Sequence, residues 1–126
     1  MTIDSSMSPD PEAVVQRQLE AYNACDLDAL VAAYADDAEL YEHPHTLLAR
    51  GSAQIRARLA PRLREPNLRA HLVQRMVMGD MVVDQELITR TFPEGTGRLE
   101  MIAIYEVREG RIARAWFKSG AKTLDH

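Results

Sequence analysis

The residues with the clearest potential for chemistry lie in one short segment, Ala35 to Pro44. An acidic turn leads into a predicted strand, Ala38 to His43, which carries Tyr41 and His43 before a proline ends it. Titratable side chains at the end of a strand, next to a helix that must cover them, indicate a pocket.

His43 is the leading candidate for acid–base catalysis, because an unperturbed imidazole titrates near pH 6.5. A general base must come within about 3 Å of the proton that it removes, and a side chain at a strand end can point into a pocket. Tyr22, Tyr41 or Gln18 could then donate a hydrogen bond to a substrate oxygen. A structural histidine, held by a neighbouring carboxylate at the pocket rim, explains the same residue equally well.

A metal site is the first alternative. His43 and His45 could share a strand face, with Glu39 or His71 as a further ligand, and zinc uses such groups. Pro44 between the histidines and the lack of a clear third ligand weigh against it. We therefore expect no metal and no cofactor.

Two further groups could be reactive. Asp84 and Glu86 share a face of a predicted strand and could form a carboxylate pair, but the expected register places them outside, where an ion pair with Arg90 or Arg114 fits better. Cys25 is the only cysteine, and no basic residue near it in the sequence would lower its pKa, so packing at a helix end explains it best.

The chain of 126 residues, 46% apolar and 27% charged, fits one globular domain. We expect a disordered N-terminal tail over residues 1–10, a domain over residues 11–120 and a C-terminal tail over residues 121–126. No apolar run approaches the roughly 20 residues that cross a bilayer, and the first residues lack the pattern of a secretory signal. A cytoplasmic protein without membrane contact is expected, in keeping with the single cysteine.

Charge is distributed unevenly along the chain, whose formal net charge is −4. Residues 1–49 are strongly acidic, whereas residues 50–75 contain seven arginines and one acid. This basic block could attract an anionic ligand or a nucleic acid. A solvated helix face balanced by the acidic segment is the simpler explanation, because no aromatic residues interleave the arginines, and we expect no nucleic-acid partner.

Helical patterns precede strand patterns along the chain. The spacing of Val15, Leu19 and Tyr22 predicts a helix over residues 12–24, and Asp26 caps a second helix. A third helix begins near Gly51, and Pro61 should kink it or end its regular part. Long strands then follow in a meander, which indicates an α+β architecture: residues 68–78, 81–92, 98–108 and 111–119, with Pro93 to Gly97 as one of the turns.

Both faces of the predicted sheet contain large apolar residues. If Met101, Ala103 and Tyr105 face the helices, Ile102 and Ile104 face outward, where an antiparallel sheet normally shows polar residues. We expect a homodimer formed through this back face. Its expected residues are Val82, Ile88, Ile102, Ile104 and Trp116. The alternative is that the C-terminal tail, residues 121–126, covers part of this surface.

The order of elements resembles the SnoaL-like branch of the nuclear-transport-factor-2-like superfamily, which includes ketosteroid isomerases and polyketide cyclases. The resemblance covers about residues 12–119 and rests on five features. They are Val14-Val15-Gln16-Arg17, Tyr22-Asn23-Ala24-Cys25-Asp26-Leu27-Asp28-Ala29-Leu30, Tyr34-Ala35-Asp36-Asp37-Ala38, the strand that ends in His43-Pro44, and Gly51 and Gly110-Arg111-Ile112 as element starts. It implies a cone-shaped, strongly bent, mostly antiparallel sheet with three helices closing a pocket.

The resemblance also implies a register for the pocket. The three groups of a ketosteroid isomerase fall on Gln18, His43 and Ala103, so none of them is retained unchanged. Implied catalytic residues are His43, Tyr22 and Tyr41. Implied substrate-binding residues are Gln18, Val83, Gln85, Leu87, Met101, Ala103, Tyr105 and Phe117.

Fold constrains the reaction only weakly in such a family. We expect a small protein that binds an apolar carbonyl compound and acts on it by proton transfer, as in isomerisation, cyclisation or dehydration. A non-catalytic ligand-binding or accessory protein is the second possibility. A dimeric scaffold is weaker, because polar residues on the inner face would be unfavourable in a plain core.

Overall fold

A computed structural model describes residues 10–125, which form three helices and six strands. In chain order they are α1 (Pro11–Asn23), α2 (Leu27–Ala32), β1 (Tyr34–Glu42), β2 (Thr46–Arg50), α3 (Gly51–Leu63), β3 (Arg69–Met78), β4 (Met81–Phe92), β5 (Gly95–Arg108) and β6 (Arg111–Leu124). The predicted α+β class is confirmed. The expected N-terminal tail lies outside the described residues except for Asp10, whose carboxylate accepts a hydrogen bond from the Ala13 N–H and caps α1.

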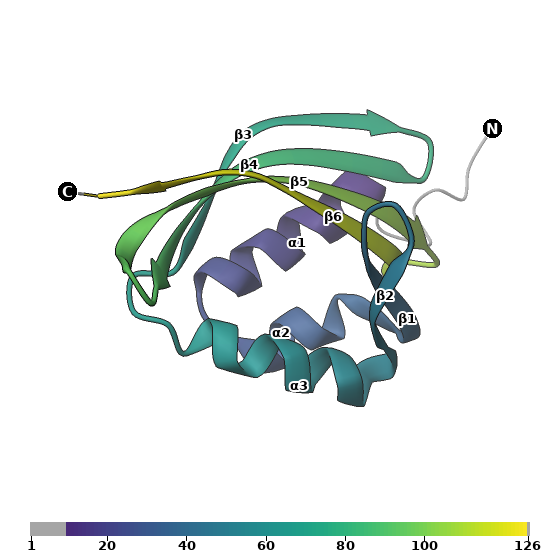
Figure 1. The fold of residues 1–126 in the computed structure, drawn as a ribbon. Coiled ribbons are helices and arrows are strands. Elements are labelled where there is room, and N and C mark those ends of the chain that lie inside the picture. Colours follow the sequence, from purple (N-terminus) through teal and green to yellow (C-terminus); the bar gives the residue numbers. More distant parts are fainter. Residues whose placement is uncertain (1–9, 126) are drawn as a thin grey trace.

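The strands form one bent sheet in the order β2-β1-β6-β5-β4-β3. The β1–β6 pair is parallel, and the other neighbours are antiparallel. The long strands arch over the helices, as Figure 1 shows, and β2 and β3 are the two edges. The sheet is therefore strongly bent, as predicted, but it does not close into a barrel.

Helix α1 lies against the concave face of the sheet (Figure 1). The predicted apolar stripe is buried there, with Val15 and Leu19 in the core. Asn23, at the end of the helix, both donates to the Ala70 carbonyl (2.9 Å) and accepts from the Ala70 N–H (2.8 Å). Asp26 then caps α2 as expected, accepting from the Ala29 N–H.

Strands β1 and β5 begin earlier than expected, at Tyr34 and Gly95, and two strands differ further from the expectation. Strand β2 was missed, because it is only five residues long and half-exposed at the edge of the sheet. Strand β6 continues beyond Ser119 to Leu124 and stays paired with β5. Residues 121–124 therefore extend the sheet, and they do not fold over its back face.

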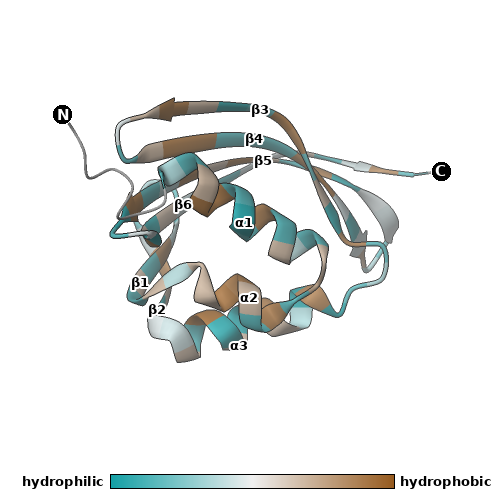
Figure 2. Cartoon of the chain, turned by 180° about the vertical axis from the view of Figure 1, so that it is seen from behind, coloured by the Kyte–Doolittle hydropathy of each residue, from teal (hydrophilic) through white to brown (hydrophobic). Residues whose placement is uncertain are grey.

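An apolar row crosses the back of the sheet. Paired residues of adjacent strands share a face, so the register defines this row. From β3 to β2 its members are Met76, Val83, Ile104, Trp116, Tyr41 and Leu47. The hairpin end of β3 and β4 is strongly apolar (Figure 2), and Met76 is 61% exposed. Ile102, Ile104 and Trp116 thus face outward as predicted. Val82 and Ile88 are instead buried in the core, so their expected place in the dimer surface is wrong.

Candidate active site

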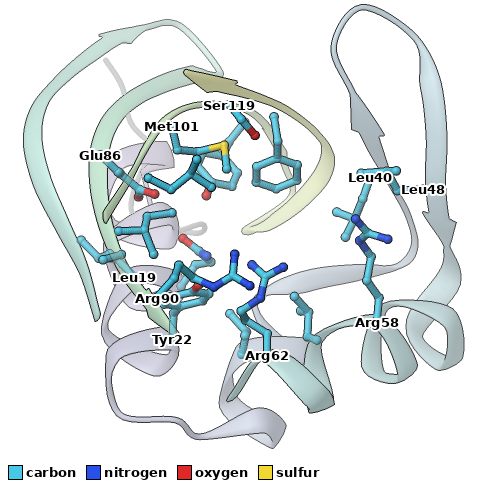
Figure 3. A pocket seen from close by; sticks show the side chains of 18 of the residues that line it. Leu19, Tyr22, Leu40, Leu48, Arg58, Arg62, Glu86, Arg90, Met101 and Ser119 are labelled. Carbon is cyan, nitrogen blue, oxygen red and sulfur yellow. The ribbon is translucent and has the colours of Figure 1, made fainter. Parts of the chain in front are cut away.

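A cavity of about 290 Å³ lies between the concave face of the sheet, α1 and α3 (Figure 3). Its size is at the lower end of the range for small-molecule sites. Half of its lining residues are apolar: Leu19, Leu30, Leu40, Leu48, Leu59, Ala70, Ile88, Leu99, Met101 and Phe117. Its polar groups are Gln18, Tyr22, Tyr34, Glu42, Arg58, Arg62, Glu86, Arg90, Tyr105 and Ser119.

Glu86 is the unusual group in this wall. It comes from the middle of β4, and only 7% of its surface is exposed. None of the described residues forms an ion pair with its carboxyl group. Burial, and secondarily the nearby Asp84 carboxylate, raise the pKa of Glu86 to about 7, against the opposing effect of Arg75. Near neutral pH the group can therefore either accept or donate a proton.

The register of β4 places Glu86 inside. Strands β4 and β5 pair from Phe92 opposite Gly95, so Pro93 and Glu94 alone form the loop. Glu86 therefore lies opposite Met101, on the face that turns toward the helices.

This register contradicts the expected facing of β4. Val83 and Leu87 lie on the back face, Gln85 is exposed there, and Asp84 and Glu86 are the residues that point inward. The register implied by the family resemblance places the alternate residues of β4 inside. A shift of one residue exchanges the two faces of a strand.

Two polar side chains of α1 reach the cavity, as predicted. Burial raises the pKa of the Tyr22 phenol, although Arg62 and Arg90 act in the opposite direction, so the hydroxyl stays protonated. Gln18 is 6% exposed, and within the described residues its Oε1 has no hydrogen-bond partner. A ligand that donates a hydrogen bond here would satisfy this buried oxygen.

Two more tyrosines, Tyr34 and Tyr105, line the cavity. Burial raises the pKa of both Tyr34 and Tyr105 well above the ordinary value, so both rings are neutral. Tyr105 packs edge-on against Phe117, with ring centroids 6.1 Å apart. Met101, Tyr105 and Phe117 were expected to line the pocket and do so, whereas Ala103 is buried on the same face without reaching the cavity.

Arg62 of α3 and Arg90 of β4 lie next to each other in the wall of the cavity (Figure 3). Arg90 donates two hydrogen bonds of 2.8 Å to Glu65. Arg62 contacts the same carboxylate at 3.5 Å. Arg58 extends from α3 toward Leu40 (Figure 3). No carboxylate of the described residues lies within 4 Å of its guanidinium group.

His43 is not in the cavity. It lies in the turn after β1, its side chain is exposed, and its backbone N–H donates to the Phe117 carbonyl. Tyr34, Leu40 and Glu42 are the β1 residues that line the cavity, so alternation places Tyr41 on the back of the sheet. There Tyr41 stacks on Trp116 and donates to Glu39. The inward placement expected for His43 and Tyr41 is therefore wrong.

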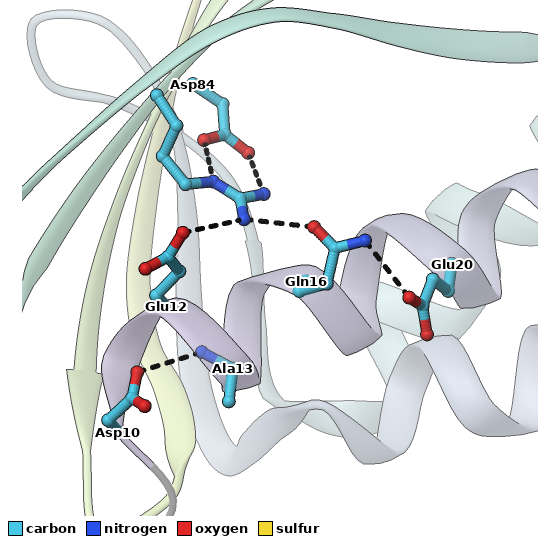
Figure 4. Close-up of polar contacts among 7 residues, drawn as sticks. Asp10, Glu12, Ala13, Gln16, Glu20 and Asp84 are labelled. Atoms are coloured by element: carbon cyan, nitrogen blue, oxygen red, sulfur yellow. Dashed lines mark hydrogen bonds and ion pairs between the residues drawn. The ribbon is translucent and has the colours of Figure 1, made fainter.

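A buried ion pair fixes α1 to the strand that carries Glu86 (Figure 4). Asp84 is fully buried and accepts two hydrogen bonds from Arg75, at 2.7 and 2.9 Å. Arg75 also donates to Gln16 (3.0 Å) and lies 3.8 Å from Glu12, both on α1. This contact, and not a surface pair with Arg90 or Arg114, is the role of Asp84.

The described residues form neither a metal-binding cluster nor a membrane-spanning helix. Between residues 10 and 125 no three His, Cys, Asp or Glu side chains lie close enough together to hold a metal ion. Nor does any helix of this part of the chain have the length and apolar character that a bilayer crossing requires. Cys25 is exposed at the end of α1.

Comparison with known proteins identifies the family. The model of the SnoaL-like domain matches residues 15–115. The chain belongs to the SnoaL-like family. No curated protein is similar enough to this SnoaL-like chain to count as a match.

Solved structures with the same fold differ widely in sequence from this SnoaL-like protein. An uncharacterised cystatin-fold protein from Novosphingobium aromaticivorans is 23% identical with a TM-score of 0.80, covering 87% of this chain and 98% of its own. An LEH-like epoxide hydrolase from M. tuberculosis is 17% identical with a TM-score of 0.75, and the match covers 87% of this chain and 82% of the hydrolase chain. A candidate polyketide cyclase from Sinorhizobium meliloti is 24% identical with a TM-score of 0.67, covering 91% and 99%. At these identities the likeness establishes the fold alone.

Proposed function

We propose that this SnoaL-like protein binds a small apolar carbonyl compound and moves a proton on it without a cofactor, with Glu86 as the acid–base group. The observation that carries the proposal is a buried carboxyl group, free of ion pairs with described residues, in the wall of a cavity that also contains ten apolar residues. Its pKa of about 7 suits proton transfer near neutral pH. Isomerisation, cyclisation and dehydration all need such a step.

The other polar groups have consistent roles in this proposal. A proton removed next to a carbonyl leaves negative charge on the oxygen, which must be stabilised by hydrogen-bond donors. Tyr22 has a protonated hydroxyl, and Gln18 has an amide, and both come from α1 and line the same cavity as Glu86. The apolar wall keeps water away from the charge that develops.

The test does not need the natural substrate. Exchange of the protons next to the carbonyl of indanone, followed by NMR in deuterated buffer, measures proton transfer directly. We expect the protein to accelerate this exchange, and Glu86→Gln to reduce the acceleration by a factor of about a hundred or more. Glu109→Gln, which changes an exposed glutamate in the β5–β6 turn, is the matched control. Equal exchange by wild type and Glu86→Gln would exclude Glu86 as the base.

A non-catalytic binding protein is the second candidate. The observation that favours it is that the two oxyanion donors of a ketosteroid isomerase correspond to Gln18 and Ala103, and a methyl group donates no hydrogen bond. In that case indanone would bind, as seen by saturation-transfer NMR, while its exchange rate stays at the value in buffer.

A further inference from the structure

We propose that the ligand of this cavity is a small apolar carboxylic acid, whose carboxylate binds Arg58 and Arg62 while its apolar body extends toward Glu86. The inference deepens the proposed function by naming the ligand class, and it rests on that function for the use of this cavity.

The first argument is the balance of charge on the α3 side of the cavity. Arg90 is matched by Glu65, which accepts two hydrogen bonds from it at 2.8 Å. Arg62 has only a contact of 3.5 Å with the same carboxylate. Within the described residues Arg58 has no ion-pair partner at all, so this side of the cavity contains more guanidinium groups than carboxylates to pair with them.

The second argument is burial. The Arg62 side chain is about one-third exposed, and it stands beside apolar residues of the same wall, such as Leu59. A guanidinium group in such surroundings binds a carboxylate more strongly than one in open water, and its fork matches the two oxygens. Glu42 also lines the cavity and would repel an anion, but its side chain is exposed to water at the end of β1, as that of Arg58 is on α3.

The third argument is shape. Arg58 and Arg62 lie on the α3 side of the cavity, and Glu86 lies away from them on β4 (Figure 3). Leucines, Met101 and Phe117 occupy the wall between. A ligand that satisfies all three parts has a negatively charged end, an apolar body and a reacting carbon near the carboxyl group of Glu86.

The experiment compares two probes of the same shape, phenylbutyrate and phenylbutyramide, by isothermal titration calorimetry in low salt. At about pH 6 the probe acid is ionised while Glu86 remains mostly protonated, so the contrast reports the arginines. We expect wild type to bind the acid about tenfold more tightly than the amide. Arg58→Gln and Arg62→Gln should each remove several-fold of that preference, because they weaken binding of the acid more than binding of the amide.

Arg56→Gln is the matched control, because Arg56 belongs to the same helix but pairs with Asp28 outside the cavity. Equal affinity for the two probes, no binding of either, or an equal loss of preference in Arg56→Gln would each overturn the proposal. Glu86→Gln separates this inference from the proposed function. It should retain the arginine-dependent preference for the acid even if no proton transfer is found in any variant.

Discussion

Asp84 and Glu86 occupy the same face of β4, two residues apart, yet their carboxyl groups have opposite surroundings. Asp84 receives two hydrogen bonds from Arg75, whereas Glu86 faces the cavity without an ion pair to any described residue. Because like charges disfavour each other, the Asp84 carboxylate contributes to the raised pKa of Glu86. One strand therefore carries both a structural carboxylate and a reactive one.

The structural role of the pair predicts a large loss of stability. Arg75→Met leaves the Asp84 carboxylate buried without its partner, and we expect it to lower the free energy of unfolding by about 3–5 kcal/mol. Urea unfolding followed by circular dichroism measures this. Arg69→Met, at an exposed position of the same strand, should change it little. A loss below about 1 kcal/mol in Arg75→Met, as for a surface pair, would contradict a buried role.

The raised pKa of Glu86 predicts how stability depends on pH. The folded protein holds this proton up to about pH 7, whereas the unfolded chain releases it near 4.5. The stability associated with Glu86 is thus fully present below 4.5 and is lost as the pH rises through about 7.

The side chain of Glu86→Gln stays neutral at every pH. Between about pH 4 and pH 8 the free energy of unfolding of this variant should therefore rise relative to that of wild type by roughly 3 kcal/mol. Urea unfolding across this range is the measurement, with Glu109→Gln as control. Parallel stability curves for wild type and Glu86→Gln would mean that the pKa of Glu86 is not raised.

The same group sets the pH dependence of proton transfer. If Glu86 is the base, the rate of indanone exchange should rise with pH below about 7 and level off above it, as the carboxylate becomes populated. The measurement is the NMR exchange rate at a series of pH values, corrected for exchange in buffer. A midpoint near the ordinary glutamate value of 4.5 would assign the base to another carboxyl group.

Tyr22 is expected to stabilise the oxyanion. Tyr22→Phe removes only the hydroxyl, so the rate of exchange should fall by about a hundredfold while indanone binding changes little. Tyr41→Phe is the informative comparison, because this tyrosine lies on the back of the sheet and its loss should leave exchange unaffected. Equal effects of the two substitutions would remove Tyr22 from the proposed mechanism.

The apolar row on the back of the sheet leads us to propose a homodimer formed through this face. Ile104 and Trp116 are adjacent near the middle of the row, so Ile104→Glu should place a charge in the interface and convert the dimer to a monomer. Light scattering at micromolar concentration is the measurement. Thr123→Glu, at an exposed position near the end of β6, should remain dimeric. A monomeric wild type would refute the interface.

Much of the fold follows from local patterns. The spacing of Val15, Leu19 and Tyr22 predicts α1, and Gly79 with Asp80 marks the β3–β4 turn. Strand β2 was beyond such reasoning, because a short, half-exposed edge strand lacks a buried face to create alternation. The extension of β6 was missed because its last residues, which include Gly120 and Lys122, are exposed and have no apolar pattern.

The site was predictable only on some of its walls. Residues of α1 were placed correctly because the helix has one clearly apolar face. In β5 the inner face has a longer apolar series than the outer face, which has only Ile102 and Ile104. Strand β4 has apolar residues on both faces, Val82 and Ile88 inside against Val83 and Leu87 outside, so periodicity cannot choose between them. A carboxylate in a strand also normally faces water, so Glu86 was expected on the outer face of β4.

The signal that could have found Glu86 is the length of the β4–β5 loop. With Pro93 and Glu94 as a two-residue connection, Met101 and Glu86 must be partners. The cavity arginines had a weaker signal. Arg58 and Arg62 are four residues apart on α3, on the side that also carries Leu59, but nothing local separates them from Arg56, which faces away.

The attachment of α1 at both ends determines how a ligand can reach the interior. Arg75 ties its first turns to β3 and β4, and Asn23 ties its last turn to Ala70. This helix therefore cannot lift without breaking buried polar contacts. Two ion pairs connect α3 and the residues just after it to the rest of the protein. One is the exposed Arg56–Asp28 pair, and the other is the Glu65–Arg90 pair beyond the end of the helix. We expect molecules to be admitted and released past α3, so that they meet the arginines before they meet Glu86.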